Sequence, residues 1–447
     1  MRSNTAIKQH GFTLIEVLVG LTIFAIVMVG FYTLMDYGTK ILSDNRARVD
    51  AIAIANKRME MIRNLSYDDV GIASGIPNGT IPQTEVVVLN HITYTLETDI
   101  RYVDDPFDGT ASGSPPDTNS ADYKSVRIEV TWSRMLINKP IVLVTEVTPK
   151  GMEKTVDGGT ILLTVFDAHG QPVPSAAVHI ENTDVVPVIS YDTTTQTNGT
   201  LVLPGMPPSI ETYDVRVTKD GFSTDQTYEV DPVANPNPAH PPLSVYLNVV
   251  TEASFAIDQL GTATIRTLDQ ASQPLPNIDF ALHGSKIIGT DGENNPIYKY
   301  TQTFTTNASG EITIPDLEWD TYHFSIDNAG INYDIAGANP PLPITLDPGA
   351  TQNTDIALET PHANHTLLVT VRDQNMVLMP NVPVQLNRVV PPYNGQKTTT
   401  AWGQAFFTPL EQSDYVLHIE VTGYEIYNEL ITVEGQRTIE VVMIPPI

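Results

Sequence analysis

The sequence has no cysteine, and this absence excludes several kinds of chemistry at once. Disulfide bonds, thiolate metal sites and cysteine nucleophiles are all ruled out, and cysteine usage gives no information on the redox compartment. Basic residues are also scarce, with 24 Lys and Arg against 52 Asp and Glu, for a formal net charge of -28. Binding of nucleic acid or of an anionic membrane surface needs clustered positive charge, so this balance argues against both and favours divalent cations.

Familiar catalytic motifs are missing as well. The sequence contains no Gly-x-Ser-x-Gly elbow, phosphate loop, dinucleotide fingerprint or His-Glu-x-x-His helix. His362 and His365 stand close together, but they lie between two strand-rich repeats and not on a helix, which favours a solvated linker over a metal pair. We therefore expect a protein that is not an enzyme.

The residues that are abundant indicate β structure distributed over several cores. At about 150 residues per domain, 447 residues predict three domains or more. The 34 prolines and 28 glycines, together with frequent Thr and Val, are typical of short strands joined by many turns. The expected fold class is mainly β, and the exception is one long helix at the N-terminus.

The N-terminal segment predicts a single membrane helix. No charged side chain occurs from Val17 to Met35, and at about 1.5 Å rise per residue such a helix crosses the ~30 Å hydrocarbon layer once. A secretory signal peptide would have its small-residue cleavage site after the apolar run, and none follows Met35. A small residue instead precedes the run, at Gly11, and a carboxylate, Glu16, lies near its start.

The stretch Lys8-Gln9-His10-Gly11-Phe12-Thr13-Leu14-Ile15-Glu16-Val17-Leu18 resembles the class III signal of type IV prepilins. The resemblance implies that a prepilin peptidase, as a partner, cuts after Gly11 and methylates the new amino terminus of Phe12. It also implies that Glu16 pairs with the Phe12 amine of a neighbouring pilin or pseudopilin subunit, which offsets the cost of burying both charges. The alternative for Glu16 is a position at the membrane interface.

The same resemblance sets the expected location. It implies a single pass through the inner membrane with the C-terminal part outside the cytoplasm, followed by assembly into a cell-surface or periplasmic filament. Five basic residues after the helix oppose a simple positive-inside count, and we give the signal motif more weight: Lys40, Arg46, Arg48, Lys57 and Arg58. No proline occurs between Met1 and Gly75, unlike many major pilins and like many minor pilins and pseudopilins.

Beyond the membrane the helix is expected to continue and to pack on a sheet. An apolar stripe at spacings of seven and three consists of Leu42, Val49, Ile52, Met59 and Ile62. Four strand-like runs follow and predict an antiparallel meander over this stripe, at residues 83–89, 92–103, 123–133 and 140–147. We therefore expect a leader at 1–11, a pilin helix at 12–65 and a pilin-like sheet at 66–150.

A loop rich in oxygen ligands separates the second and third of these strands. Its candidate calcium ligands are Asp104, Asp105, Asp108, Asp117, Asn119 and Asp122. The spacing is not that of an EF-hand, so a solvated acidic turn is favoured over a calcium site, which stays a hypothesis. Some pseudopilins bind calcium in a loop of their sheet, although this loop does not align with theirs residue by residue.

The remainder of the chain contains three repeats. The opening strands share a Thr-to-Asp pattern, and each is followed by a proline-marked turn, at residues 160–167, 262–269 and 366–373. Further turns recur at Asn198-Gly199, at Asn307 with Gly310, and at Trp402-Gly403. The repeats resemble carboxypeptidase regulatory-like, or transthyretin-like, domains, which implies three Ig-like β-sandwiches at 158–250, 258–360 and 364–447. That resemblance carries no peptidase activity.

These features together predict a minor type IV pilin-like filament subunit that displays extracellular sandwiches for assembly, adhesion or surface interaction. The alternative is a pseudopilin of a type II secretion system that contacts secreted substrate or the channel. A surface glycan or protein is a further expected partner. Trp319 and Trp402 could stack on glycans, but a single Trp in a sandwich is more often part of the core, so the sequence assigns no binding site to them.

Overall fold

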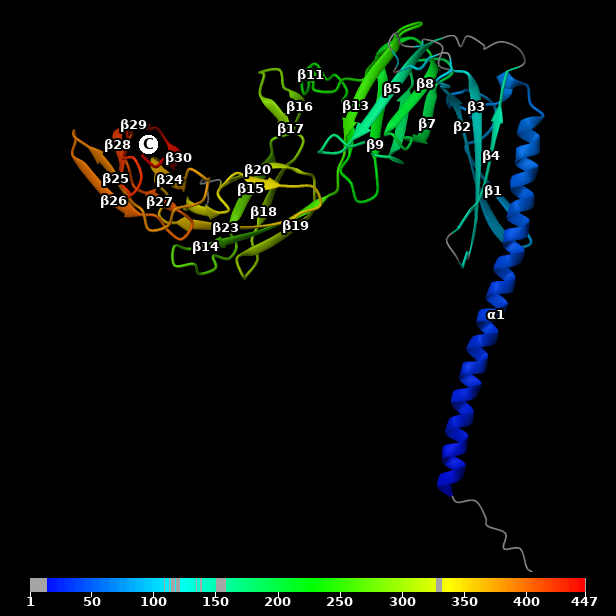
Figure 1. Cartoon of the computed structure of the whole chain (residues 1–447), viewed down its shortest axis with the longest axis horizontal. Helices are drawn as coiled ribbons and strands as arrows, with labels where there is room; N and C mark the ends of the chain where they lie inside the picture. The colour runs from blue at the N-terminus through cyan, green and yellow to red at the C-terminus, as the bar shows by residue number, and fades with distance from the viewer. Residues whose placement is uncertain are drawn as a thin grey trace, which may run out of the picture.

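The computed structural model describes residues 14–107, 109–111, 113, 117, 121–133, 135–136, 139–149, 158–326 and 332–446. Gly11 and Phe12, between which cleavage is predicted, lie outside the described residues, as do Asp108 and Asn119 of the acidic loop. The expected fold class is confirmed, because one N-terminal helix is followed by sheets that are mostly antiparallel. Figure 1 shows the parts following one another in chain order, from α1 to the C-terminus in the last sandwich.

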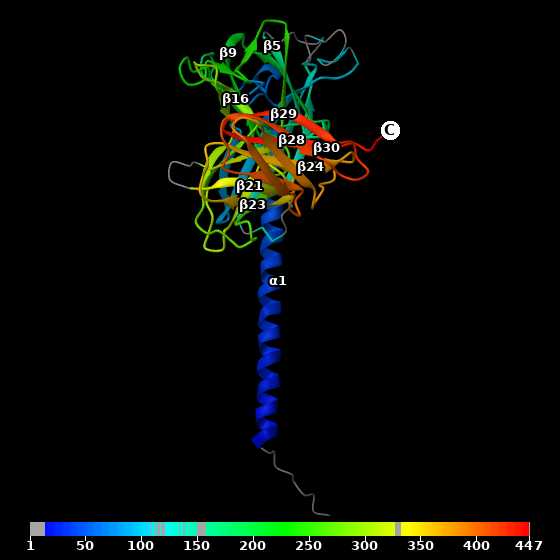
Figure 2. The ribbon, with the colours of Figure 1, turned by 90° about the vertical axis from the view of Figure 1, so that its left-hand side faces the viewer.

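The single long helix, α1 (Leu14–Arg63), packs on the first sheet with its C-terminal half. Its buried face consists of Ala47, Ala51, Ala55, Met59 and Ile62, at spacings of four and three. Three of the five positions are alanines, which let the helix backbone approach the sheet closely. Figure 2 shows the N-terminal half projecting away from the β structure.

This packing corrects the predicted helix stripe. Met59 and Ile62 are buried as expected, but Leu42, Val49 and Ile52 are 61%, 65% and 40% exposed. The large apolar side chains suggested one stripe, whereas the sheet binds a face that begins with three alanines and shares only Met59 and Ile62 with that stripe. An apolar stripe therefore stays on the outer surface of α1, beyond the membrane-spanning part.

The first sheet is the predicted meander. Its strands are hydrogen-bonded in sequence order and are all antiparallel: β1 (Thr84–Leu89), β2 (Ile92–Val103), β3 (Tyr123–Trp132) and β4 (Ile141–Val147). Alternate residues of β2 and β3 are buried, as the period of two requires for a sheet with one covered face. A short 3-10 helix, η1 (Tyr67–Asp69), joins α1 to this sheet.

Each repeat forms two packed sheets. The first repeat comprises β5 (Gly159–Phe166), β6 (Ala177–Asn182), β7 (Ile189–Thr194), β8 (Thr200–Met206), β9 (Ser209–Thr218), β10 (Asp225–Gln226), β12 (Leu243–Val245) and β13 (Val250–Ala256). The second comprises β14 (Gly261–Leu268), β15 (Asp279–Gly284), β18 (Thr301–Thr305), β19 (Glu311–Leu317), β20 (Asp320–Ser325), β21 (Asp334–Asn339), β22 (Ile344–Leu346) and β23 (Thr351–Glu359). The third comprises β24 (Thr366–Asp373), β25 (Pro383–Arg388), β26 (Tyr393–Thr398), β27 (Gln404–Phe407), β28 (Ser413–Ile419), β29 (Tyr427–Val433) and β30 (Gln436–Met443).

A shared topology shows that the repeats are structurally equivalent. In each, the first strand pairs in parallel with the last: β5 with β13, β14 with β23, and β24 with β30. An aspartate at the end of each first strand, or directly after it, forms the same turn in all three repeats. One carboxylate oxygen of Asp167, Asp269 or Asp373 accepts the backbone N–H groups two and four residues later, at 2.8–2.9 Å. This side-chain turn explains why the repeats keep Asp there.

A small sheet joins the first two sandwiches. The proline-rich segment of the first repeat contributes β11 (Asn237–Pro238), which pairs with β16 (Ile287–Thr290) of the second, and β17 (Pro296–Tyr298) completes the sheet. Figure 1 shows these strands between the two sandwiches. The first proline-rich segment thus acts as a connector with hydrogen bonds to the next sandwich.

Candidate functional site

The first half of α1 has a continuous apolar surface. Its large apolar side chains from Leu14 to Leu42 are exposed, and among the described residues it is the one helix long and apolar enough to cross a membrane. Two hydroxyls in this part are satisfied by the helix itself. Thr22 Oγ1 donates to the carbonyl oxygen of Leu18 at 2.8 Å, and Thr33 Oγ1 to that of Gly30 at 2.8 Å. These two hydroxyls are therefore paired within the helix, as polar groups in a membrane must be.

Polar contacts begin where the helix reaches the first sheet. Lys40 and Asp36 form an ion pair of 2.6 Å one helical turn apart, and Trp132 Nε1 donates to Asp44 Oδ1 at 3.0 Å. Arg58, whose side chain is 6% exposed, pairs with Glu85 of β1. The contacts of Asp44 and Arg58 hold the helix on the sheet, whereas the Lys40–Asp36 pair lies within α1. The apolar half of α1 ends where these polar contacts begin.

Glu16, the predicted assembly residue, lies in the apolar end of this helix. Glu16 is the third residue of α1, and the predicted cleavage position comes four residues before it in the chain. The described residues thus place Glu16 at the N-terminal end of a helix whose neighbouring surface is apolar and exposed. Its pairing with Phe12 of a neighbouring subunit stays a prediction.

The acidic loop between β2 and β3 gathers several of its predicted ligands. Asp122 Oδ2 accepts the backbone N–H of Asp105, and Asp104 Oδ2 accepts that of Ala111 at 2.8 Å. The backbone N–H of Asp117 donates to Thr110 O at 2.8 Å, which folds the loop back on itself. Carboxylates from both ends of the loop therefore lie together, a donor set that suits calcium, although they also order the backbone as a plain turn would.

The first sheet and the first sandwich share one hydrophobic core. Buried residues of α1, of β2 and β3, and of β5 to β9 form a single cluster. Tyr191 of β7 is 1% exposed, and its hydroxyl donates to Asp99 Oδ1 at 3.1 Å and Ile100 O at 3.2 Å, both on β2. Burial raises the pKa of Tyr191 well above its usual range. The head and the first sandwich therefore form one packed body.

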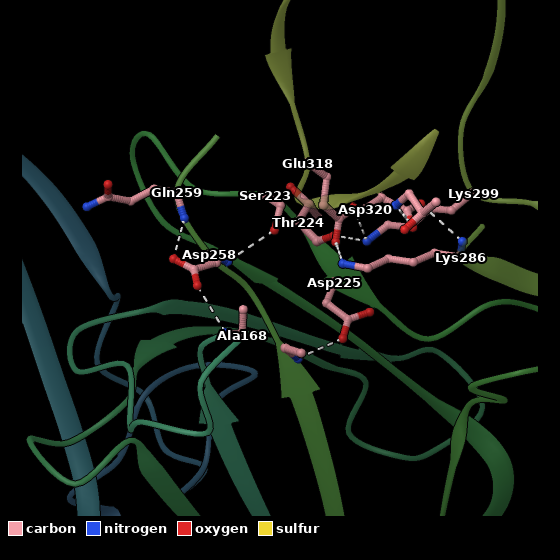
Figure 3. A network of polar contacts seen from close by, with 12 residues as sticks. Ala168, Ser223, Thr224, Asp225, Asp258, Gln259, Lys286, Lys299, Glu318 and Asp320 are labelled. Carbon is pink, nitrogen blue, oxygen red and sulfur yellow. Dashed lines mark hydrogen bonds and ion pairs between the residues drawn. The ribbon is translucent and has the colours of Figure 1, made fainter. Parts of the chain in front are cut away.

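A charged cluster of the second sandwich contacts the first sandwich through Lys299. Lys286 and Lys299 each lie 2.8 Å from a carboxylate oxygen of Glu318, and Lys299 Nζ also donates to Thr224 O of the first repeat at 2.6 Å (Figure 3). The Lys286 ammonium lies 3.2 Å from the centre of the Trp319 ring. Burial lowers the pKa of Lys286, against the opposing effect of Glu318. Trp319 is thus part of this junction.

One further group near this junction has the composition of a metal site. One ligand atom each from Asp167, His169 and Asp258 lies within 4.8 Å of the others. Their oxygens, however, already accept backbone hydrogen bonds. Asp258 Oδ2 accepts the N–H of Ala168 at 3.0 Å and its Oδ1 that of Gln259 at 2.7 Å (Figure 3). The group orders the turn after β5.

The second and third sandwiches meet in a seam centred on Asp334, whose side chain is 1% exposed. Its carboxylate accepts Gln436 Nε2 at 2.6 Å and the N–H of Ala363 at 2.8 Å, and it lies 2.6 Å from His362 Nδ1. His362, expected in a solvated linker, instead packs on this buried carboxylate. The linker between the two sandwiches is therefore docked.

Two buried polar contacts, one in the head and one in the seam, gave no sequence signal. Lys124 on β3 is 2% exposed, and its ammonium donates to the carbonyl oxygens of Tyr67 and Val70 at 2.7 Å. In the seam, Gln404 Oε1 accepts the N–H of Ala338 from the neighbouring sandwich at 2.8 Å. Each is a polar residue within an otherwise ordinary strand pattern, so only the packing partner identifies its role.

Comparison with known proteins identifies two segments. Residues 7–32 match the prokaryotic N-terminal methylation motif, and residues 160–240 match the carboxypeptidase regulatory-like domain. No curated protein matches the chain. The N-terminal segment thus carries a type IV prepilin signal, and the first sandwich is a regulatory-like domain. The prepilin signal supports a pilin-type subunit that is membrane-anchored, processed by a peptidase and assembled with other subunits.

Solved structures show only remote similarity. The TIE protein of Bacillus anthracis is 14% identical over 82% of this chain, with a TM-score of 0.19, and this chain spans 61% of its length. A shaft pilin, SpaA of Lactobacillus rhamnosus GG, is 14% identical over 46% of this chain and 100% of its own, with a TM-score of 0.19. A minor pilin of Streptococcus agalactiae is 16% identical over 42% of this chain and 96% of its own, with a TM-score of 0.17. At these TM-scores the similarities support no inference about function.

Proposed function

We propose that this chain is a minor subunit of a type IV pilus-type filament that displays three β-sandwiches outside the cell. The observation that carries the proposal is that three features occur together in one helix. The prepilin signal at 7–32 runs into α1, whose first half is apolar and exposed and whose second half is fixed to the head. A helix of 50 residues is about 75 Å long, enough to span a membrane and still support the head outside it.

In this proposal the peptidase cuts between Gly11 and Phe12, and the Phe12 amine is methylated. The amine then pairs with Glu16 of a neighbouring subunit in the filament core. A carboxylate within an apolar helix costs roughly 2.5–3.5 kcal/mol at a membrane centre, so a matched cation offsets much of this cost. The sandwiches act as structural display modules in this proposal, and catalysis has no part in it.

The size of the subunit favours a sparse position along the filament or a position at its tip. The first sandwich is fused to the head by a common core, the second is joined to the first by the small sheet and the Lys299 contact, and the third is joined to the second by the seam. Sandwiches fixed in this way cannot move aside to make room for neighbouring heads in a tightly wound fibre. The subunit is therefore better suited to rare positions or to the filament tip than to every position.

The proposal is tested by intact mass and N-terminal analysis of the full chain expressed with a prepilin peptidase. The parent chain should lose residues 1–11 and carry a methyl group on Phe12, whereas Gly11→Ala should remain uncut. A Gly30→Ala variant is the matched control, because this glycine lies beyond the cleavage position and has open space around it. An uncut parent chain would leave a membrane-anchored surface protein and refute filament processing.

A pseudopilin of a type II secretion system is the second candidate, and the acidic loop is the observation that favours it. The loop brings Asp104, Asp105 and Asp122 together at one end of the head sheet, the kind of place where some pseudopilins hold calcium. Antibody labelling of whole cells separates the two candidates. A pilus subunit exposes its sandwiches at the cell surface, whereas a periplasmic pseudopilin is labelled only after the outer membrane is opened.

A further inference from the structure

A cleft of about 350 Å³ lies beside the seam between the second and third sandwiches. Its walls come from both: the turn after β14 on one side, and β26, β27 and the turn between them on the other. The volume falls within the range of about 300–1,000 Å³ that small-ligand sites occupy. Because the seam fixes the two sandwiches to each other, the cleft has a defined shape before any ligand arrives.

Trp402 lines this cleft, and its turn does not require a tryptophan. The same turn precedes β8, β19 and β27, with a glycine of positive φ at Gly199, Gly310 and Gly403. In each turn the glycine N–H donates to the carbonyl oxygen three residues earlier, at 2.9–3.0 Å. The residue before the glycine is Asn198 in the first repeat and Ser309 in the second, and both are exposed. The tryptophan of the third repeat is therefore an addition to a turn that small polar residues satisfy.

The indole of Trp402 is held in place by the neighbouring sandwich. A Cβ atom on Gly337 of β21 would lie 3.5 Å from Trp402 Cε3 and 2.7 Å from Gln404 Oε1, so the glycine makes room for both side chains. Gln404 in turn accepts the N–H of Ala338 at 2.8 Å. A ring held by one sandwich while lining a cleft is a preorganised platform, which costs little entropy when a ligand stacks on it.

The polar lining of the cleft is mixed and nearly balanced in charge. Asp269 and Lys397 carry opposite charges, and Ser272 and Thr398 add hydroxyls. Gln270 also lines the cleft, and its amide nitrogen donates to Glu359, which fixes the amide. Burial raises the pKa of Glu359, and Lys397 opposes that shift, so this carboxyl and the lysine lie close to each other.

The residues that line the cleft suit some classes of ligand better than others. A phosphate or nucleotide needs several Lys or Arg residues, and the cleft has one lysine beside an aspartate. A lipid chain needs an apolar tunnel, whereas this cleft has donors and acceptors on both walls. A neutral saccharide fits both features. Its C–H face stacks on an aromatic ring, and its hydroxyls exchange hydrogen bonds with amides, hydroxyls and charged groups.

We propose that the cleft between the second and third sandwiches is a binding site for a neutral saccharide, with Trp402 as the stacking platform and Gln270 and Lys397 as hydrogen-bonding groups. The inference deepens the proposed display function by giving the sandwiches a ligand class. It rests on that function only for its location outside the cell. Binding in the cleft needs neither leader cleavage nor filament assembly.

The test uses the full chain in detergent with Trp319→Phe, so that Trp402 and the buried Trp132 are the remaining tryptophans. Tryptophan emission is followed while glucose, galactose, mannose, N-acetylglucosamine and their β-linked disaccharides are added one at a time. At least one sugar is expected to shift the emission and to protect it from quenching by acrylamide. Gln270→Ala should weaken the affinity for that sugar about five- to tenfold, as expected for one lost hydrogen bond.

Two further variants separate stacking from a purely structural role for the tryptophan. Trp402→Phe keeps an aromatic platform and should bind more weakly but measurably, with binding read by calorimetry. Asn198→Ala alters the equivalent turn of the first repeat and should leave affinity unchanged. If no sugar of the panel perturbs the emission, or if Gln270→Ala binds the active sugar as tightly as the parent, the saccharide site is refuted. Either result leaves the processing test of the proposed function unaffected.

Discussion

The hydroxyl of Tyr191 in the first sandwich donates to the carboxylate of Asp99 in the head sheet at 3.1 Å. The two residues are 92 positions apart, and the bond lies in a core that both parts share. Beside it, Gln83 Nε2 of the head donates to Asp192 O at 2.5 Å. The described residues of head and sandwich therefore meet in a buried interface.

Loss of this bond should destabilise head and sandwich together. Tyr191→Phe removes the donor but keeps the ring, and it should cost about 1 kcal/mol in the free energy of unfolding. Tyr191→Ala also opens a cavity and should cost about 3–5 kcal/mol. Hydrogen exchange of the full chain measures both parts at once, and Tyr246→Phe, at 51% exposure, is the control. Loosening confined to the sandwich would show that the two parts unfold independently.

Alkaline pH should destabilise the first sandwich through Tyr213. This side chain is fully buried, its hydroxyl donates to Pro207 O at 2.6 Å, and burial raises its pKa to about 12. Because the folded pKa lies above the ordinary value of about 10, the fold favours the neutral phenol. Its stabilising effect is complete below pH 10 and is lost as the pH rises through 12, by about 2–3 kcal/mol in all.

Urea unfolding of the parent chain and of Tyr213→Phe, each at pH 9 and pH 11.5, measures this effect. The parent should lose more stability between the two pH values than the variant, in the transition that reports the first sandwich. Tyr246→Phe should behave as the parent does. Equal losses in the parent and Tyr213→Phe would assign the alkaline sensitivity to other groups.

Strand order and repeats could be predicted from the sequence because their signals are local. The alternation in residues 92–103 and 123–133 reflects one covered face of the head sheet, and β2 and β3 occupy nearly those ranges. The recurring aspartates follow from a turn that spans only five residues. Asp167 and its two equivalents each order their own loop, so the pattern is visible in the chain itself.

The helix face and the junctions could not be predicted, because they depend on partners far away in sequence. Large side chains suggested a stripe through Val49, but the sheet selects the alanine face, where a close approach buries more of the backbone and strand side chains. The seam depends on Asp334 meeting Gln436, 102 positions later. Each of these residues alone looks like an ordinary polar residue in a strand.

Calcium in the acidic loop is open to a direct test. If calcium binds the folded loop, the melting temperature of the full chain should rise in its presence and fall with a chelator, because a ligand that binds only the folded state stabilises it. Asp122→Asn retains an oxygen that can accept the Asp105 N–H but removes a charge, so it should abolish the response. Asp220→Asn, at an exposed position, should keep the calcium-dependent rise in melting temperature. No chelator effect on the parent would leave the loop as a solvated turn.

The outward stripe of α1 gives a prediction about assembly that is separate from folding. Val49 is 65% exposed, and Leu42 and Ile52 extend the same apolar surface, which continues the exposed half of the helix. In the proposed filament a neighbouring subunit covers this surface, since an isolated apolar stripe of this length in water is a mark of an interaction site. Val49→Asp should therefore leave the monomer intact and block incorporation, because burying an unpaired carboxylate is costly.

Circular dichroism melting and filament co-purification measure the two effects separately. Val49→Asp should melt within a degree or two of the parent, since surface changes of this kind usually alter stability by less than about 0.5 kcal/mol, yet be absent from sheared filaments. Val49→Thr, which keeps the shape without a charge, should be incorporated. Ala51→Asp on the buried face should instead lower the melting temperature, because Ala51 has no exposed surface. Normal incorporation of Val49→Asp would show that this stripe stays in solvent, and the neighbour's contact would then be limited to the membrane half of the helix.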